Sequence, residues 1–394
     1  MTARMRPLNI TIVQGAFLPV PPLLGGAVEK AWHALGLEFA RQGHRVVHVS
    51  RAHPALPATN VEHGVEHRRV RGHATPSSLL WLKFLDLLYS RRVRRVLPAA
   101  DVLVTNTFWL PLLERRASRG VPYVHVGRYP KGQLRYYPRR VVLQTVSAPI
   151  RDAILRELPD AAARIRVLPY PLSPAYLVEQ RAPARVILYA GRLHPEKGVH
   201  LLIEAFAQRA ATSLHGWTLR IIGPWQTAQG GGGESYRAKL AALAAPAGAS
   251  IDVREPIFDA DQLVAHYQQA AIFAYPSLAE FGETFGLAVL EAMAAGCAPV
   301  VSSLACFGDF LKSGENGLVF DHRERDPVAA LGRALQEVAN SQALCDRLRA
   351  AAWPTARAYA LPEIALRFLR DFHAITERPA EIGSHVTPCL PDQT

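Results

Sequence analysis

The sequence YPSLAEFGETFGLAVLEAMAAGCAP occupies residues 275–299 and decides the organisation of the chain. It holds two carboxylates, Glu283 and Glu291, separated by a glycine-containing turn and an apolar run rich in helix formers. This pattern predicts a strand that ends near Tyr275, a turn, and a helix that begins near Gly286. The glycines of the turn permit a ligand to approach the backbone closely, and the helix N-terminus offers free amides to an anion.

Two interpretations of this segment remain open at this point. At a rise of about 1.5 Å per residue, the two carboxylates would lie about 12 Å apart. That separation suits a long ligand with hydroxyl groups at both ends, such as a nucleotide sugar. The alternative is a capped core helix with two solvated acidic side chains and no ligand.

The composition describes a globular protein of more than one domain. With 394 residues, 49% of them hydrophobic and 20% charged, the chain exceeds the size at which a single core stops growing. It shows no apolar run of membrane-spanning length and no secretory h-region. Its four cysteines have neither metal-ligand spacing nor a disulfide pattern. These features predict a cytoplasmic location.

The net charge of +12 is concentrated in the first half of the chain, in basic clusters at 91–95 and 128–140. Such clusters suit an anionic surface, which could be a membrane, nucleic acid or a phosphorylated acceptor. They are equally consistent with ordinary solvated faces. Residues 77–97 are apolar at helical spacing and basic at their end, which favours a helix packed on a sheet over one lying on a membrane.

Strand and helix patterns alternate along both halves of the chain. Residues 8–14 read as a first buried strand, and a proline-rich loop then leads through Gly25 and Gly26 into a helix. This glycine pair could hold a phosphate or a sugar, although it is not the GxGxxG fingerprint of nicotinamide enzymes. A proline-rich linker at 164–174 precedes a second series of strands and helices. The alternation predicts two parallel-sheet domains facing a cleft.

The loop in AGRLHPEKG places Arg192 and Lys197 just beyond a predicted strand, where ligands bind in open α/β sheets. Two cations there would neutralise a diphosphate. A surface loop with ordinary charges is the alternative for either residue alone. The sequence Asp259-Ala-Asp261 offers a metal-binding DxD pattern, but its position at a helix start favours a cap.

Taken together, these segments resemble the retaining glycosyltransferases of family 4, which have the GT-B fold. The resemblance lies in three stretches, GGAVEKAWHALGLEFARQGHRVV, LYAGRLHPEKGVHLLIEAFA and ETFGLAVLEAMAAGCAPVVSS, with SGENGLVF behind the last. It covers most of residues 8–375, and the paired-glutamate signature of the family matches Glu283 and Glu291.

The resemblance implies a role for each matching residue. Arg192 and Lys197 would bind the donor diphosphate, Glu283 the hydroxyls of the donor sugar, and Glu291 the ribose hydroxyls. His125, at the end of a strand, would face the transferred sugar, so that His125, Arg192, Lys197 and Glu283 form the implied catalytic set. The remaining implied donor-binding residues are Gly25, Gly26, Gly191, Thr284, Phe285 and Gly286.

The resemblance also implies the domain organisation and the chemistry. An acceptor-binding domain would span 1–172, a nucleotide-sugar-binding domain 173–355, and a helix at 356–375 would cross back to the first domain, followed by a disordered tail at 376–394. Transfer would retain the anomeric configuration without a metal or cofactor. The leaving diphosphate would help to deprotonate the acceptor, so no side-chain nucleophile is assigned.

Three segments depart from the family pattern. Tyr170-Pro171 replaces an Asn-Gly, Pro224-Trp225 stands where the family has a charged residue or glycine, and 252–257 lacks a glycine. The first two departures put the selectivity for base and sugar in doubt, because these loops would border the nucleotide.

The resulting prediction is a hexosyltransferase that uses a nucleotide-diphosphate sugar and a saccharide or lipid-linked acceptor in polysaccharide or lipopolysaccharide assembly, peripheral at the inner membrane face. One alternative is a non-catalytic binder of sugar nucleotides or nucleic acid, for which Tyr129, Tyr136 and Tyr137 among arginines give a weak hint. Another is a soluble disaccharide synthase or phosphorylase. Catalysis is favoured because Arg192, Lys197 and both glutamates are present.

Overall fold

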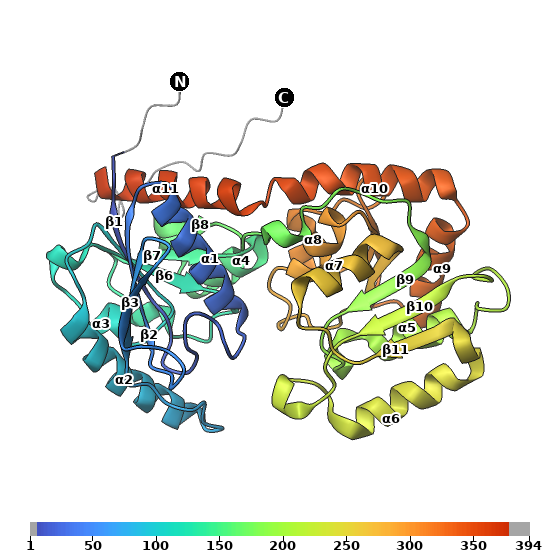
Figure 1. Cartoon of the computed structure of the whole chain (residues 1–394), viewed down its shortest axis with the longest axis horizontal. Helices are drawn as coiled ribbons and strands as arrows, with labels where there is room; N and C mark the ends of the chain where they lie inside the picture. Colours follow the sequence, from blue (N-terminus) through green and yellow to red (C-terminus); the bar gives the residue numbers. More distant parts are fainter. Residues whose placement is uncertain (1–5, 378–394) are drawn as a thin grey trace. The chain divides into compact units, whose positions relative to one another are not determined.

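The computed structural model describes residues 6–377, which form two compact units. The first unit contains the chain up to Pro171 together with the segment from Leu361 onward, and the second runs from Leu172 to Ala360. Each unit is an α/β domain built on a parallel or mostly parallel sheet (Figure 1). The fold class of two parallel-sheet domains is therefore confirmed.

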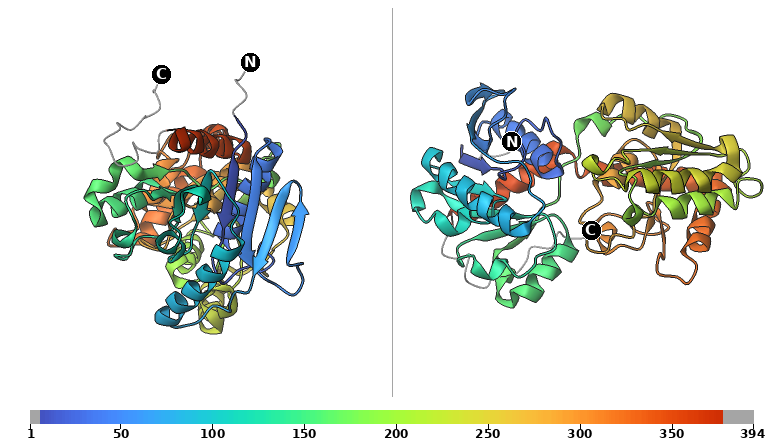
Figure 2. Two further views of the ribbon diagram at one scale, coloured as in Figure 1. Left: turned by 90° about the vertical axis from the view of Figure 1, so that its left-hand side faces the viewer. Right: turned by 90° about the horizontal axis from the view of Figure 1, so that it is seen from below.

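The sheet of the first unit has eight strands within the described residues, in the order β3-β4-β2-β1-β5-β6-β7-β8. All neighbours are parallel except β3, which forms an antiparallel hairpin with β4. Figure 2 shows the first strands of this sheet, in blue, side by side in the left view. The strands are β1 (Asn9–Val13), β2 (Arg45–Arg51), β3 (Thr59–Glu62), β4 (Val65–Val70), β5 (Val102–Thr105), β6 (Val121–Val126), β7 (Val142–Thr145) and β8 (Ile165–Val167).

The α-helices of the first unit are α1 (Ala27–Arg41), α2 (Leu79–Val96), α3 (Leu110–Leu113), α4 (Ala148–Glu157) and α11 (Leu361–Glu377). The segment predicted to be a packed helix, 77–97, forms α2, which buries only part of its surface. Its buried side chains include Tyr89 and Val93, whereas Leu80 and Trp81 are among its exposed ones. Among residues 6–377, no helix combines the length and the apolar character that crossing a bilayer requires.

Helix α11 belongs to the first unit although it follows the second in sequence. Its fully buried Phe368 and Phe372 pack edge-on against Tyr123 of β6. On the same helix, Asp371 accepts hydrogen bonds from the Tyr123 hydroxyl at 2.7 Å and from Nε of Arg166 at 2.6 Å. Burial of Asp371 raises its pKa, and the Arg166 charge and the Tyr123 hydrogen bond oppose that shift. Both partners therefore stabilise the charged form of this buried carboxylate.

The second unit has a six-stranded parallel sheet within its described residues, in the order β11-β10-β9-β12-β13-β14. The order places β9 beside β12, so the loops that follow these two strands leave the same edge. The strands are β9 (Ala184–Ala190), β10 (Thr218–Ile222), β11 (Ile251–Arg254), β12 (Ala270–Tyr275), β13 (Ala298–Ser302) and β14 (Leu318–Phe320). The α-helices are α5 (Val199–Ala207), α6 (Gly233–Ala244), α7 (Ala260–Gln269), α8 (Leu287–Ala294), α9 (Pro327–Ala339) and α10 (Gln342–Arg357).

Several predicted boundaries can be compared with these elements. The observed division at 171/172 lies one residue from the predicted one, and α10 and α11 occupy the segment where a crossover helix was placed at 356–375. Of the predicted disordered tail, residues 376 and 377 belong to α11, which corrects the prediction there, and 378–394 lie outside the described residues. Asp259 caps α7 by accepting a hydrogen bond from the amide of Gln262, as the cap interpretation predicts.

Candidate active site

The loops after β9 and β12 contact each other at Gly198. The glycine allows the two backbones to approach unusually closely. Gly198 adopts the left-handed conformation with φ +67°, and a Cβ at this position would clash with the carbonyl oxygen of Pro276. The amide of Leu278 also donates to the carbonyl of Glu196 at 2.7 Å. Glycine is therefore required here by both conformation and space, and the contact brings Lys197 to the loop that carries Glu283.

Lys197 and Glu283 form a nearly buried ion pair at the end of these strands. The Lys197 Nζ lies 2.6 Å from Glu283 Oε2, and the two side chains are only 8% and 12% exposed. The Tyr275 hydroxyl donates a second hydrogen bond to the same carboxylate oxygen at 3.1 Å, and its ring stacks on Tyr189. Two residues assigned to different parts of a donor are thus partners of each other in this structure.

Arg192 lies on the same loop but stays accessible to solvent. Its guanidinium donates to the carbonyl of Gly230 at 2.6 Å and to Glu196 Oε1 at 3.0 Å, and the side chain is 42% exposed. The contact with Gly230 connects Arg192 to the glycine-rich loop that precedes α6. Sequence reasoning gave that loop no role, and the structure shows that it positions this guanidinium.

The turn before α8 presents backbone rather than side chains. Gly286 caps the helix in the left-handed conformation with φ +92°, where a Cβ would clash with the ring of Phe307. The Phe285 side chain is buried against Phe310 and Tyr359, so that only its backbone is available to a ligand. Thr284 precedes it in the same turn, and the binding of an anion by the amides of this segment stays a prediction.

Glu291 lies on α8 and is half-buried. Burial raises the pKa of Tyr176 and Tyr267, and the nearby charge of Glu291 raises both further. The predicted ribose-binding carboxylate therefore lies near these two phenols. Gly191 follows β9 directly and begins the loop that carries Arg192.

In the first unit, His125 is the penultimate residue of β6, and a series of hydrogen bonds fixes its tautomer. Gln144, paired with His125 across β6 and β7, donates its amide hydrogens to the carbonyls of Thr145 and Leu168 at 2.9 and 2.6 Å. Its Oε1 must then accept, so His125 Nδ1 carries the proton in their 2.6 Å contact. The unprotonated Nε2 accepts from the Tyr170 hydroxyl at 3.0 Å.

The chemistry of His125 follows from this environment. Burial lowers its pKa to about 4, so the ring is neutral at neutral pH. The ring also packs edge-on against Trp32 of α1, with centroids 5.9 Å apart. His125 is therefore a neutral, oriented group whose second nitrogen is already hydrogen-bonded to Tyr170.

Gly25 and Gly26, at the start of α1, both have positive φ values of 79° and 97°. Gly26 is the N-cap residue of the helix, and a Cβ at this position would clash with the carboxylate of Glu29, a buried acid whose pKa is raised by burial. Tyr170 lies close enough to Glu29 to feel its charge. The three predicted residues of the first unit thus belong to one region around α1 and the end of β6.

The structure therefore gathers the predicted residues into two sets, one in each unit. Sequence reasoning missed several residues that hold these sets in place. The pairing of His125 with Gln144 could have been predicted only from the register of β6 and β7, and Tyr170 was noted merely as a departure from a family pattern. The missed residues are Glu29, Gln144, Tyr170, Tyr275 and Gly198.

Comparison with known proteins places this geometry in a class. Residues 179–353 match the family described as "Glycosyl transferases group 1". A sucrose-phosphate synthase from Thermosynechococcus elongatus superposes with a TM-score of 0.73 and 19% identity, covering 93% of this chain and 99% of that one. The two units together thus have the GT-B fold found in glycosyltransferases.

The sequence relatives each match part of this chain. A D-inositol 3-phosphate glycosyltransferase of Acidothermus cellulolyticus is 29% identical over 61% of this chain and 47% of its own length. A GDP-mannose:cellobiosyl-diphosphopolyprenol alpha-mannosyltransferase of Xanthomonas campestris is 29% identical over 50% of this chain and 49% of its own length. The chain spans about half the length of these relatives. Residues 179–353 are similar to the group 1 glycosyltransferases, in agreement with the resemblance found in the sequence.

The buried pair of Lys197 and Glu283 predicts strong energetic coupling. Lys197→Met and Glu283→Gln should each lower the free energy of unfolding by about 3 kcal/mol, because each leaves one charge buried and unpaired. The double variant should lose no more than either single variant, since neither charge then remains. Urea denaturation of the four proteins measures this cycle.

The exposed pair Lys312 and Glu315 provides the control, because its side chains are 72% and 68% exposed. Lys312→Met should change the stability by less than about 0.5 kcal/mol. Additive losses in the buried cycle would show that Lys197 and Glu283 do not stabilise each other.

The environment of His125 predicts an unusual titration. Its Cε1 proton resonance, assigned with a His125→Gln variant, should stay constant from pH 8 to pH 5 and move with a midpoint near pH 4. Because the unfolded imidazole protonates near pH 6.5, the group contributes stability above that pH and loses it as the pH falls toward 4. A midpoint near 6.5 would contradict the buried, hydrogen-bonded state.

Proposed function

We propose that this protein is a retaining glycosyltransferase that moves a hexose from a nucleotide-diphosphate sugar to a saccharide or lipid-linked acceptor. The observation that carries the proposal is the pair of Lys197 and Glu283 beside Arg192, at the ends of the adjacent strands β9 and β12. Ligands bind at this edge in open parallel sheets. The relatives include a GDP-mannose-dependent mannosyltransferase, which supports a nucleotide-sugar donor.

The residues of the second unit suit a diphosphate and a sugar. Arg192 retains a half-exposed guanidinium and Lys197 an ammonium, and both would stabilise charge that develops on a leaving diphosphate. Glu283 would exchange its bond to Lys197 for hydroxyls of the donor sugar. The α8 turn at Gly286 would bring backbone amides to the donor, and Glu291 would accept from the ribose hydroxyls.

The reaction we propose needs no metal ion and no cofactor. The glycosidic bond to the diphosphate breaks as the acceptor hydroxyl bonds to the anomeric carbon on the same face, and a diphosphate oxygen takes the hydroxyl proton. The configuration is thereby retained without a side-chain nucleophile. His125, neutral and oriented by Gln144, would contact the sugar through a hydrogen bond that competes with Tyr170.

A donor screen tests this proposal. UDP-, GDP-, ADP- and dTDP-sugars are added with chelator, and the series that binds should raise the melting temperature by mass action. Glu291→Ala should abolish that increase, whereas Glu337→Ala, an exposed helical glutamate of the same unit, should preserve it. With the donor identified, Lys197→Met should lower the transfer rate by about 10²–10³-fold, and NMR should show a product with the anomeric configuration of the donor.

Other outcomes would redirect the assignment. Stabilisation without transfer to any saccharide or lipid-linked acceptor would favour a non-catalytic sugar-nucleotide binder. Transfer to a free sugar alone would favour a disaccharide synthase. If none of the four donor series raises the melting temperature, even with magnesium, the transferase proposal fails.

We also propose that α2 binds the protein to an anionic membrane surface, where the acceptor lies. The first turns of this helix expose Leu79, Leu80, Trp81 and Phe84, which are 48–81% exposed, beside the exposed cation Lys83. Further along the helix Arg91 and Arg95 are exposed. An apolar strip flanked by cations is the pattern of helices that lie in the membrane interface.

Vesicle binding tests this surface. The protein should sediment with vesicles containing anionic lipid at low salt, and the variant Leu80→Ser/Trp81→Ser should lose most of this binding. Phe258→Ser provides a matched control, because it removes an aromatic residue that is 73% exposed in the second unit. Absence of binding to anionic vesicles at low salt, or equal loss in the control, would contradict the proposal.

A further inference from the structure

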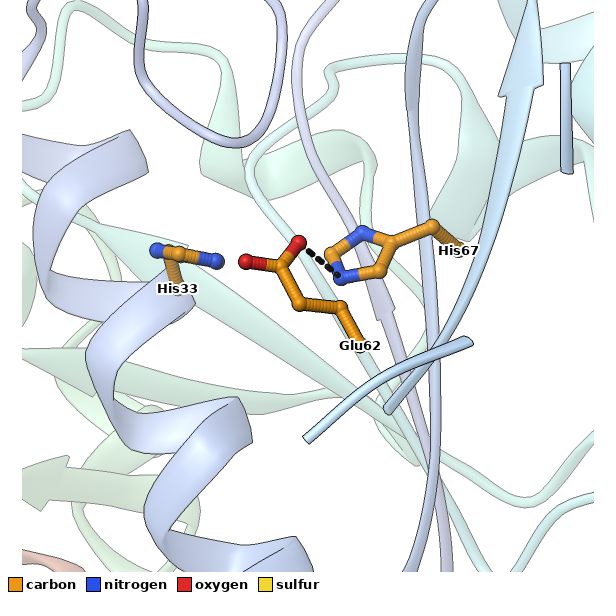
Figure 3. A group of neighbouring side chains, drawn as sticks. All are labelled: His33, Glu62 and His67. Atoms are coloured by element: carbon orange, nitrogen blue, oxygen red, sulfur yellow. Dashed lines mark ion pairs between the residues drawn. The ribbon is translucent and has the colours of Figure 1, made fainter. Parts of the chain in front are cut away.

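Three potential metal ligands meet in the first unit, in the part of the fold that the proposed reaction does not use. His33 lies on α1, Glu62 ends β3, and His67 lies in β4 (Figure 3). One ligand atom from each lies within 4.8 Å of the others. In Figure 3 the Glu62 carboxylate points between the two imidazoles, and its Oε2 is 3.8 Å from His67 Nε2.

The topology explains why these residues converge. His67 is paired with His48 in the register of β2 and β4, and their rings stack at 5.7 Å on the face that α1 covers. His33 of α1 lies 6.0 Å from the His67 ring. The β3–β4 hairpin then returns Glu62 to the same place. Three elements distant in sequence thus contribute one ligand each.

Within residues 6–377, three of the four imidazole nitrogens of His33 and His67 are buried without a hydrogen-bond partner. His67 is fully buried, and neither of its nitrogens has a hydrogen-bond partner among the described residues. The buried Nε2 of His33 is in the same state. A buried polar atom without a hydrogen-bond partner is destabilising, so a ligand that satisfies both rings would be favoured.

The charges of the cluster also bear on its ligand. Arg69 opposes a cation, but its guanidinium is directed at the carbonyls of Val20 and Pro57 and at the side chain of Asn60. Glu62 supplies the compensating negative charge.

We propose that His33, Glu62 and His67 bind one transition-metal ion, with Zn²⁺ the best match to two imidazoles and a carboxylate. Zinc accepts this ligand set and leaves a fourth position for water. Tetrahedral ligands of zinc lie about 3.3 Å apart, so the cluster must contract. Glu62, whose side chain is 34% exposed at the hairpin end, has the freedom to do so.

The role of such an ion is structural and separate from the sugar-transfer chemistry. It would join α1 to the β3–β4 hairpin, and α1 also carries Gly26 at its start and Trp32 against His125. The metal would thereby hold the helix that borders the predicted site in the first unit, without contacting a substrate.

Metal binding by the full chain, without an affinity tag, tests the proposal. Dialysed protein should bind about one equivalent of Zn²⁺, and Co²⁺ should give visible absorption bands that Zn²⁺ removes. His33→Gln and Glu62→Gln should each weaken Zn²⁺ binding at least about tenfold. His63→Asn, which changes an exposed histidine with φ +46° in the adjacent turn, should bind as the native protein does.

The readout is metal binding and not transferase activity, so it does not depend on the proposed function. Circular dichroism establishes that each variant is folded, and Glu62→Gln, a substitution of a half-exposed side chain, provides a folded variant if a histidine change disrupts the core. The proposal would be overturned if the native protein bound no Zn²⁺ at micromolar concentration. It would also be overturned if His33→Gln and Glu62→Gln bound Zn²⁺ as tightly as the native protein does.

Discussion

The close approach of Gly198 to the carbonyl of Pro276 is the constraint on which the second unit depends. It brings the loop after β9 onto the loop after β12, and this contact lets Lys197 and Glu283 pair out of water. A side chain at position 198 would separate the two loops and expose both charges. The ion pair follows from two backbones that only glycine allows to approach so closely.

The first unit uses a different means to hold a polar group in a buried place. Gln144 is fixed by two carbonyls and therefore presents only its oxygen to His125, which determines which ring nitrogen carries the proton. The tyrosine at position 170 then satisfies the other nitrogen. This series of hydrogen bonds cannot rearrange without leaving a buried group unpaired. The orientation of His125 is therefore defined before any ligand binds.

The sequence predicted the architecture well because alternating apolar strands and capped helices depend on local patterns. The helix after Gly286, the cap at Asp259 and the loop with Arg192 all follow from residue types and spacing. The partners of these residues did not follow, because strand register and the packing of distant loops decide them. The pairing of Lys197 with Glu283, and the meeting of His33 with His67, require the order of strands in space.

The anchoring of α11 by Asp371 has a consequence for how the protein is made. Tyr123 and its acceptor Asp371 are 248 residues apart, so the first unit is interrupted by the whole of the second. During synthesis at about 5–20 residues per second, the second unit emerges as a continuous segment, while the first waits roughly ten to forty seconds for its last helix. Until then, the nascent first unit exposes the surface that Phe368 and Phe372 later cover.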